Sequence, residues 1–416
     1  MLKKWTFFKN SGISFKTLSI LFTLKFIVGV SVYYVYTYYY TDRNTADVFK
    51  YFDDAKYLYE NVYKINPLRF WKIIFGIQNE SSEIRYNLLE TNYWFKPHSS
   101  NIFNDNRTVI RFNAVIYLFS FGYYHVHTLV LSTLSFIGLT GIFKAFFIHF
   151  KNQKKELIIA CFLIPSVLFW GSGILKESIL LFGIGLFVFA FTQFLLVDNK
   201  IKYIFLILIT LGLLAITKTY VLIVLLPSIL AWVLIQYLKI NKIGLTFLII
   251  NLSIITLAFN AKKIHPSLDF TGNLKYKQQD FINVARDTKA GSTIKLGILD
   301  DTAWSYIKNC PEAFLNGLFR PTLFEIKNVF FSFSAFENTI LFFLILLLIF
   351  FFKKPQKEQL PLMYFGLYFT ILLTLLIGLT VPVLGAIVRY KTPFMPFTLS
   401  IILLSIDFKK IKSKFF

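Results

Sequence analysis

The chain has 416 residues, of which 56% are hydrophobic, 19% aromatic and only 16% charged, and its formal net charge is +22. A soluble domain of this size carries about a quarter charged residues, so the composition excludes an ordinary soluble protein. The positive charge does not indicate nucleic-acid binding, because the lysines stand in short clusters between apolar runs and no RNA-binding motif accompanies them.

The apolar residues form uninterrupted runs of about twenty, the length that crosses the hydrocarbon core of a bilayer. The sequence therefore predicts an all-α polytopic membrane protein, with one membrane domain over residues 1–416 and about ten transmembrane helices. We expect these helices at 17–39, 124–148, 157–171, 174–196, 202–217, 219–238, 243–259, 338–352, 360–380 and 382–406. The first run ends in an aromatic stretch with no small-residue cleavage site, which favours a retained span over a signal peptide.

Short basic linkers decide the predicted topology. With ten spans, the basic loops all fall on the same side as the basic N-terminus, which includes Lys3 and Lys4. The positive-inside rule places that side in the cytoplasm, so we expect cytoplasmic termini. The loops expected there are 149–156, 197–202, 239–242 and 353–359.

Two long segments, 41–123 and 260–337, are then expected on the outer side. Their mixture of charges, aromatic residues and helical patterns predicts folded loops that contain interfacial helices. Residues 108–122 are apolar enough to suggest an additional span, which would invert the topology after it. Because this segment is short and carries Arg111 and Asn113, we expect a helix that lies on the outer membrane surface.

Acidic residues open the first outer loop. Asp47, Tyr51 and Asp54 stand at i, i+4 and i+7, so they share one face if this segment is helical. A carboxylate just outside the membrane can act as a general base for a hydroxyl acceptor, or it can hold a divalent cation. On spacing alone, a solvated charged loop is the simpler explanation.

Basic side chains are predicted on the same side of the membrane. Lys176 and Glu177 occupy the expected outer turn 171–178, and Lys218 and Tyr220 occupy the next one, 217–220. These positions would bring cations near the carboxylates of the first loop.

Arg389 lies about seven residues into the last predicted span. An arginine at that depth is costly and usually faces a polar cavity, and its planar fork suits phosphate. Lys391 either shares this role or snorkels to lipid headgroups. Arg320, at the end of the second loop, is a weaker candidate. His125 and His127 point to different faces of one helix, so we interpret them as interfacial residues and not as a metal pair.

Two short stretches resemble a known family. Asp47-x-x-x-Tyr51, with acidic Asp53 and then Ala55, resembles the Asp-Glu-x-x-Tyr-x-x-x-Ala stretch that follows the first span of the C-type membrane glycosyltransferases. These enzymes include the protein O-mannosyltransferases and the lipid A aminoarabinose transferases. The stretch 389–396, Arg-Tyr-Lys-Thr-Pro-Phe-Met-Pro, is similar to an Arg-Tyr-x-x-Pro-x-x-Pro stretch in their later spans.

The resemblance implies transfer of a sugar from a polyprenyl-phosphate-linked donor to a glycan, lipid or protein acceptor, at the outer face of a bacterial inner (plasma) membrane. It implies that Asp47 is the catalytic base. Val48 stands where the family has a second acidic residue, which leaves Asp53 and Asp54 as rival bases. The cofactor stays open, with a divalent cation as one candidate. The expected donor phosphate-binding residues are Arg389, Lys218, Lys176 and Arg320, and the expected cavity residues are Tyr51, Glu177, Tyr220 and Tyr390.

Three other functions stay open. A polymerase of polysaccharide repeat units would need the same lipid-linked donor and the same phosphate-binding residues. A transporter or flippase of lipid-linked glycans would be expected to show inverted repeats and broken helices, and we find no such pair in the sequence. A non-catalytic scaffold of an envelope complex would need no outward arginine in a span.

Overall fold

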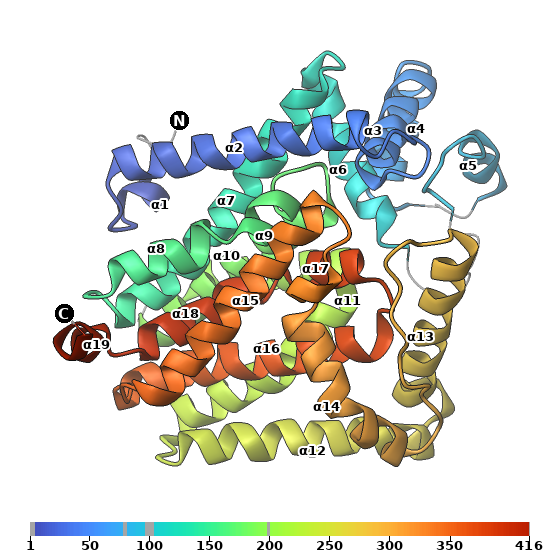
Figure 1. Cartoon of the computed structure of the whole chain (residues 1–416). Coiled ribbons are helices and arrows are strands. Elements are labelled where there is room, and N and C mark those ends of the chain that lie inside the picture. Colours follow the sequence, from blue (N-terminus) through green and yellow to red (C-terminus); the bar gives the residue numbers. More distant parts are fainter. Residues whose placement is uncertain (1–4, 78–80, 96–103, 198–199, 416) are drawn as a thin grey trace. The chain divides into compact units, whose positions relative to one another are not determined.

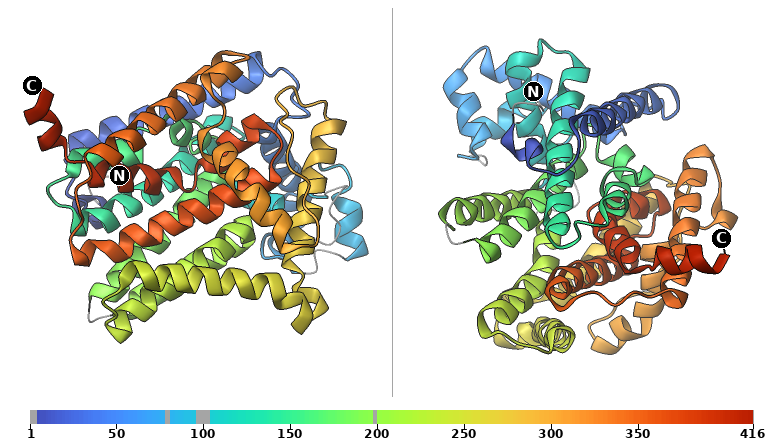
Figure 2. Two further views of the ribbon diagram at one scale, coloured as in Figure 1. Left: turned by 60° about the horizontal axis from the view of Figure 1, so that its bottom comes forward. Right: turned by 90° about the vertical axis from the view of Figure 1, so that its left-hand side faces the viewer.

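The computed structural model describes residues 5–77, 81–95, 104–197 and 200–415 (Figures 1 and 2). Lys3, Lys4 and the parts 78–80 and 96–103 of the predicted first outer loop lie outside the described residues. The described residues form helices and no strand, apart from the isolated bridges Thr293–Val383 and Phe352–Ile406. The predicted all-α class is therefore confirmed.

The helices follow one another along the chain as labelled in Figure 1. They are α1 (Thr6–Lys9), α2 (Phe15–Tyr38), α3 (Asp47–Tyr57), the π-helical turn η1 (Leu58–Tyr63), α4 (Pro67–Ile74), α5 (Ser82–Asn87), α6 (Asn106–Ser120), α7 (Tyr124–His149), α8 (Lys154–Phe162), α9 (Pro165–Trp170), α10 (Lys176–Leu196), α11 (Ile201–Leu238), α12 (Ile243–Ile264), η2 (Pro266–Leu268), α13 (Phe270–Asp287), α14 (Ala303–Phe319), η3 (Leu323–Glu325), α15 (Val329–Phe350), η4 (Lys357–Gln359), α16 (Leu360–Thr380), α17 (Leu384–Lys391), α18 (Met395–Ser405) and α19 (Phe408–Phe415).

Seven helices of the described chain are long and apolar enough to cross a membrane: α2, α7, α10, α11, α12, α15 and α16, the last counted from Lys357. They coincide with predicted spans, which confirms a polytopic membrane protein. The predicted boundary between 202–217 and 219–238 falls inside α11, where two helices meet at a kink and Lys218 has non-helical angles (φ −152°, ψ 87°).

Two other predicted spans are interrupted. In 157–171, α8 ends at Phe162 and α9 begins at Pro165, because a proline lacks the N–H and crowds the preceding turn. In 382–406, α17 ends at Lys391 and α18 begins at Met395. The prediction of two continuous spans was wrong here, and so was the interpretation that the chain has no pair of broken helices.

Other boundaries also differ. The helix α15 begins at Val329, well before the predicted start at 338. Lys176 and Glu177 form the first turn of α10, where a short loop was expected.

The chain divides into two compact units, each described by itself. Unit 1 comprises 1–141 and 167–219, and unit 2 comprises 142–166 and 220–416. In unit 1, the described residues of 41–123 pack around a buried core that includes Tyr51, Phe70, Trp94, Val109 and Ile110. These residues are therefore folded, and their position on the outer side stays a prediction.

The segment 108–122 forms the helix α6, as expected. Its 15 residues are short for a span, and Arg111 Nε donates to the Ile73 carbonyl at 2.9 Å. Burial lowers the pKa of Arg111 to about 10. One face of α6 packs in the core of unit 1, and its placement on the membrane surface stays a prediction.

Within unit 1, α7 and α10 cross at glycines. A Cβ added at Gly138 would lie 2.1 Å from the Leu181 carbonyl oxygen, and one added at Gly185 would lie 1.9 Å from the Gly138 oxygen. Only glycine allows backbones to approach this closely, as at other membrane-helix contacts. The contact fixes the position of α10, whose first turn carries Lys176 and Glu177.

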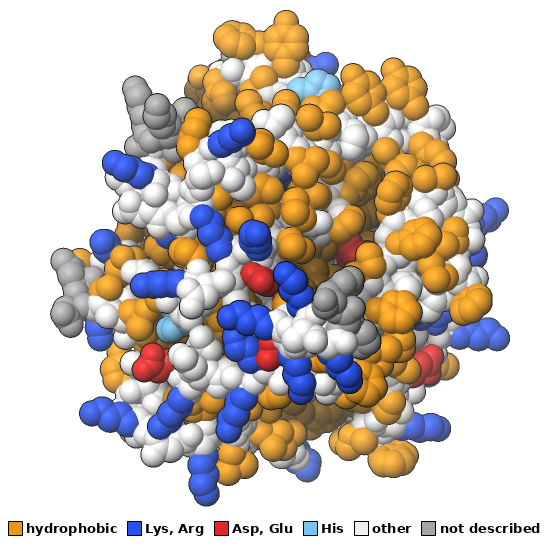
Figure 3. Space-filling view, turned by 60° about the vertical axis from the view of Figure 1, so that its left-hand side comes forward, with side chains coloured by type: hydrophobic (Ala, Val, Ile, Leu, Met, Phe, Trp, Pro, Cys, Tyr) orange, Lys and Arg blue, Asp and Glu red, His pale blue; other side chains and the backbone are white. Residues whose placement is uncertain are grey.

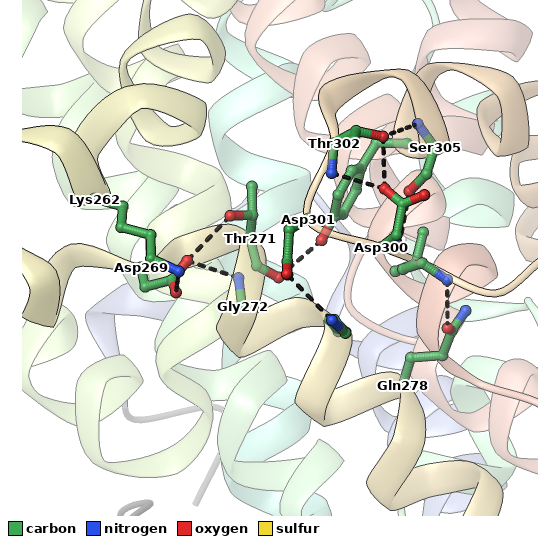
Figure 4. A network of polar contacts seen from close by, with 12 residues as sticks. Lys262, Asp269, Thr271, Gly272, Gln278, Asp300, Asp301, Thr302 and Ser305 are labelled. Carbon is green, nitrogen blue, oxygen red and sulfur yellow. Dashed lines mark hydrogen bonds and ion pairs between the residues drawn. The ribbon is translucent and has the colours of Figure 1, made fainter.

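In unit 2, α14 packs along α16 (Figure 2) through a similar contact, where a Cβ at Gly378 would lie 1.8 Å from the Ala313 oxygen. The segment between α12 and α14 is held by polar contacts (Figure 4). Gln278 accepts the Leu299 N–H at 3.0 Å and donates to the Leu379 carbonyl at 2.7 Å, which ties this segment to the end of α16. Asp269 pairs with Lys262 at 2.6 Å.

Candidate functional site

The predicted base, Asp47, is the first residue of α3, which starts shortly after α2. A carboxylate in the first helical turn is stabilised by the positive end of the helix dipole. The Tyr93 hydroxyl donates to Asp47 Oδ1 at 2.5 Å, and the Lys50 ammonium lies 4.3 Å from the centre of the Tyr93 ring. Asp47 is partly exposed in unit 1.

The shared face of α3 that the sequence predicts is present, and residues 92 and 93 cover it. The buried ring of Tyr51 lies 5.5 Å from the ring of Tyr93. Its hydroxyl donates to Asn106 Oδ1 at 3.1 Å, which links α3 to the start of α6. Tyr51 therefore positions Tyr93, and Tyr93 in turn orients Asp47.

Asp54 is buried, with 1% of its surface exposed. Its two carboxylate oxygens accept the backbone N–H groups of Asn92 and Tyr93, each at 2.7 Å. Burial raises the pKa of Asp54, although these hydrogen bonds act in the opposite direction. The geometry gives Asp54 a structural role, because its carboxylate holds the segment that carries Tyr93.

Asp53 lies on a different side of α3 and forms a forked ion pair with Arg43, with N–O distances of 3.0 and 2.5 Å. The Arg43 guanidinium also lies 4.3 Å from the centre of the Phe49 ring. Of the three carboxylates, Asp47 is thus the one that accepts a hydrogen bond from a tyrosine hydroxyl.

The lysines of the predicted donor site in unit 1 form short ion pairs. Lys176 Nζ lies 2.7 Å from Asp105 Oδ2, next to the Asn106 that binds Tyr51. Lys218 Nζ lies 3.0 Å from Glu177 Oε1, and both side chains are buried. The kink of α11 therefore directs Lys218 onto the first turn of α10.

These contacts place a row of side chains in unit 1. Hydrogen bonds join Asp47 to Tyr93 and Tyr51 to Asn106, and a ring contact joins Tyr93 to Tyr51. Asp105, which precedes Asn106 in the sequence, pairs with Lys176. The row joins α3, the start of α6 and the start of α10, which are far apart in the sequence. We call it the Asp47 line.

No protein-family model, curated protein or solved structure matches this chain. The resemblance to the C-type glycosyltransferases therefore rests on the two short stretches in the sequence. Among the described residues, no group of three or more His, Cys, Asp or Glu side chains is arranged to hold a metal ion.

The remaining predicted site residues lie in unit 2. Arg389 and Tyr390 belong to the short helix α17 and are partly buried, and the Tyr390 ring lies 6.2 Å from the ring of Phe281. Tyr220, just after the kink of α11, is also partly buried. Arg389 and Tyr390 thus share one short helix, whereas Asp47 belongs to the other unit.

Arg320 binds inside unit 2. Its guanidinium pairs with Glu325 and donates to Asn316 Oδ1 at 3.1 Å. Glu325 also accepts the Thr322 N–H at 2.8 Å. Partial burial alone would raise the pKa of Glu325, but these hydrogen bonds and the Arg320 charge lower it. Arg320 therefore stabilises the turn after α14.

Unit 2 also contains the buried charges of Glu337 and Lys391, of which the sequence singled out only Lys391. Glu337 accepts the N–H and the hydroxyl of Ser166, each at 2.7 Å. Lys391, with 1% of its surface exposed, donates to the carbonyls of Leu318 and Arg320 at 2.8 Å and to Asn338 Oδ1 at 3.0 Å. The alternative in which Lys391 snorkels to lipid headgroups was therefore wrong.

His127 was expected at the membrane interface and is fully buried in unit 1. Its ring nitrogens contact Asn113 Oδ1 and Ser120 Oγ, each at 2.9 Å, so it joins α6 to α7. Its neighbour His125 is partly exposed among tyrosine rings. His127 therefore has a packing role, and its depth in the membrane stays a prediction.

Proposed function

We propose that the protein is a membrane glycosyltransferase that moves a sugar from a polyprenyl-phosphate-linked donor to an acceptor hydroxyl. The observation that carries this proposal is the Asp47 line, in which a partly exposed carboxylate at the start of α3 is oriented by the Tyr93 hydroxyl. A positioned carboxylate beside the end of the first candidate span is what a general base for an outer acceptor requires. The two short stretches that resemble the C-type enzymes point to the same reaction.

In this proposal, Asp47 takes the proton of the acceptor hydroxyl while the bond between the sugar and the donor phosphate breaks. The acceptor oxygen forms the new glycosidic bond, and polyprenyl phosphate leaves. The departing phosphate develops charge, so its electrostatic stabilisation is a large contribution, and Arg389 is the residue to which the resemblance assigns this role. Lys176 and Lys218 would serve this role only by exchanging their present carboxylate partners. We therefore assign Lys176 to holding α10 to the start of α6, and Lys218 to holding α11 to α10.

The proposed topology has ten crossings and cytoplasmic termini in a bacterial inner membrane. Contacts within unit 2 support the predicted sidedness. The loop before α8 meets the end of α18 (Gln153 Nε2 to the Leu404 oxygen, 3.0 Å) and the loop before α16 (Gln359 Nε2 to the His149 oxygen, 2.8 Å). Lys357 Nζ also binds Asn241 Oδ1 at 2.5 Å. Loops that the positive-inside rule groups together are thus hydrogen-bonded to one another.

The test of the reaction is transfer of a labelled sugar from a polyprenyl-phosphate donor in reconstituted membranes. Asp47→Asn removes the base and keeps the shape, so the rate should fall by about 10²–10⁴. The matched control is Asp42→Asn, an exposed carboxylate of the same loop, which should leave the rate within about twofold. Equal rates for the two variants would remove Asp47 from the mechanism.

One observation favours a second candidate, a transporter or flippase of lipid-linked glycans. The spans 157–171 and 382–406 are both broken, and α8 packs against α18 in unit 2. Ser166 and Lys391, which flank the two breaks, contact Glu337 and Asn338 of α15. Broken helices with buried charges are typical of transport sites. Movement of intact donor across vesicles, lost in Glu337→Gln and without release of polyprenyl phosphate, would establish this second function.

A further inference from the structure

Four chain segments of unit 2 meet at one end of the unit: the loops before α8, α12 and α16, and the segment after α18. Each of them is rich in lysine. Beyond the contacts of Gln153, Gln359 and Lys357 described above, the Lys353 N–H donates to the Ser405 oxygen at 2.8 Å, and the Asp407 N–H donates to the Phe351 oxygen at 2.9 Å. We call this surface the basic end. Its exposed lysines are Lys151, Lys155, Lys239, Lys242, Lys353, Lys354, Lys357, Lys409, Lys410, Lys412 and Lys414.

Few acidic side chains offset this charge. The same segments contain Glu156, Glu358 and Asp407, and Asp407 caps α19 by accepting the N–H groups of Lys409 and Lys410 at 3.1 and 3.0 Å. Figure 3, in which the left-hand side of Figure 1 comes forward, shows Lys and Arg side chains gathered with few Asp and Glu among them. The basic end thus carries a strong net positive charge.

Exposed apolar side chains border these lysines. Phe352, directly before Lys353, is 60% exposed, and Phe350, two residues earlier, is 72% exposed; Leu238, directly before Lys239, is 66% exposed. In a membrane protein, such side chains face lipid. The lysines therefore begin where the lipid-facing surface ends, which is the level of the headgroups.

The helix α19 adds an amphipathic element to this surface. Phe408, 40% exposed, and Ile411 are one turn apart, whereas Lys409, Lys410, Lys412 and Lys414 surround them. The Lys414 ammonium lies 5.9 Å from the Phe351 ring, so α19 stays close to the end of α15. A short basic helix with an exposed apolar side suits the interface of an anionic bilayer.

We propose that the basic end is a docking surface for acidic phospholipid headgroups, and that α19 is the part of this surface that lies on the membrane. The occupant is a lipid surface because the charge is positive, the surface is extended, and lipid-facing side chains adjoin it. Lysines near an anionic membrane each strengthen binding by about fivefold, and salt weakens this attraction.

The test uses the full chain in detergent, titrated with short-chain phosphatidylglycerol, short-chain phosphatidylcholine and inorganic phosphate. We expect phosphatidylglycerol to bind at least about tenfold more tightly than phosphatidylcholine. Replacing Lys409, Lys410, Lys412 and Lys414 by Gln should remove at least about tenfold of this affinity. If that variant does not fold, Lys353→Gln with Lys354→Gln carries the test, with a loss of about fivefold or more.

The matched control replaces four exposed lysines of unit 2 outside the basic end, namely Lys289, Lys295, Lys308 and Lys327, by Gln. This variant should bind phosphatidylglycerol like the wild type. An equal loss in the control would overturn the proposal, since net charge alone would then explain binding. Equal affinity for phosphatidylcholine, or for inorganic phosphate, would also overturn it. None of these outcomes depends on glycosyl transfer.

Discussion

The glycine contact between α7 and α10 gives a prediction whose size follows from the geometry. In Gly138→Ala, the new Cβ would lie 2.1 Å from the Leu181 carbonyl oxygen. A carbon and a carbonyl oxygen ordinarily stay about 3.3–3.6 Å apart, so the two helices must separate by more than about 1 Å. Overpacking of this kind costs about 1–3 kcal/mol.

The assay is the thermal unfolding midpoint of the purified protein in one detergent. Gly212→Ala is the matched control, because Gly212 also lies in a membrane helix of unit 1 and an added Cβ there meets nothing within 4 Å. Replacing this helical glycine should leave the protein unchanged or stabilise it by up to about 1 kcal/mol.

A double variant sharpens the test. The Cβ of Gly185→Ala would meet the Gly138 oxygen at 1.9 Å, so both substitutions push the same two backbones apart. The cost of the pair should therefore be less than the sum of the single costs. If Gly138→Ala unfolded at the same temperature as Gly212→Ala, the close backbone contact would be refuted.

Three further predictions concern the polar contacts of unit 1. Tyr93→Phe removes the hydroxyl that donates to Asp47, so the acidic limb of the pH–rate profile should move to higher pH; an unmoved profile would contradict this role. Burial raises the pKa of Asp54 above its ordinary value of 3.8. The contribution of Asp54 to folding stability is therefore complete below pH 3.8, and it is lost as the pH rises through the pKa that Asp54 has in the folded protein. The destabilisation by Asp54→Asn, measured as unfolding midpoints from acid to neutral pH, should thus be largest in acid. Glu177→Gln leaves the Lys218 ammonium buried without this carboxylate and should cost about 3–5 kcal/mol, partly restored by adding Lys218→Met; additive costs would argue against a coupled pair.

Much of the fold was predictable because a bilayer imposes length and polarity on each span. Runs of about twenty apolar residues located the seven long helices. The hydrophobic pattern alone did not show the breaks in the two interrupted spans. The prolines could have indicated them, since Pro165 and Pro393 stand at or beside the interruptions. The contacts of the buried Glu337 and Lys391 were harder to foresee, because each joins segments that are distant in the sequence.

The candidate site was predictable only in part. The spacing of Asp47, Tyr51 and Asp54 correctly predicted one shared helical face. It could not show that Tyr93, 46 residues after Asp47, covers that face. Nor could the sequence show that Asp54 and Arg320 bind within the protein, because their partners are set by the folding of the loops.

The most direct test of the central claim follows the fate of the donor. Purified protein in sealed vesicles would receive a polyprenyl-phosphate donor carrying a labelled sugar, together with candidate acceptors. The account predicts that free polyprenyl phosphate and labelled acceptor appear in equal amounts, and that Asp47→Asn stops both. Passage of the intact donor across the bilayer, with no polyprenyl phosphate released, would contradict it.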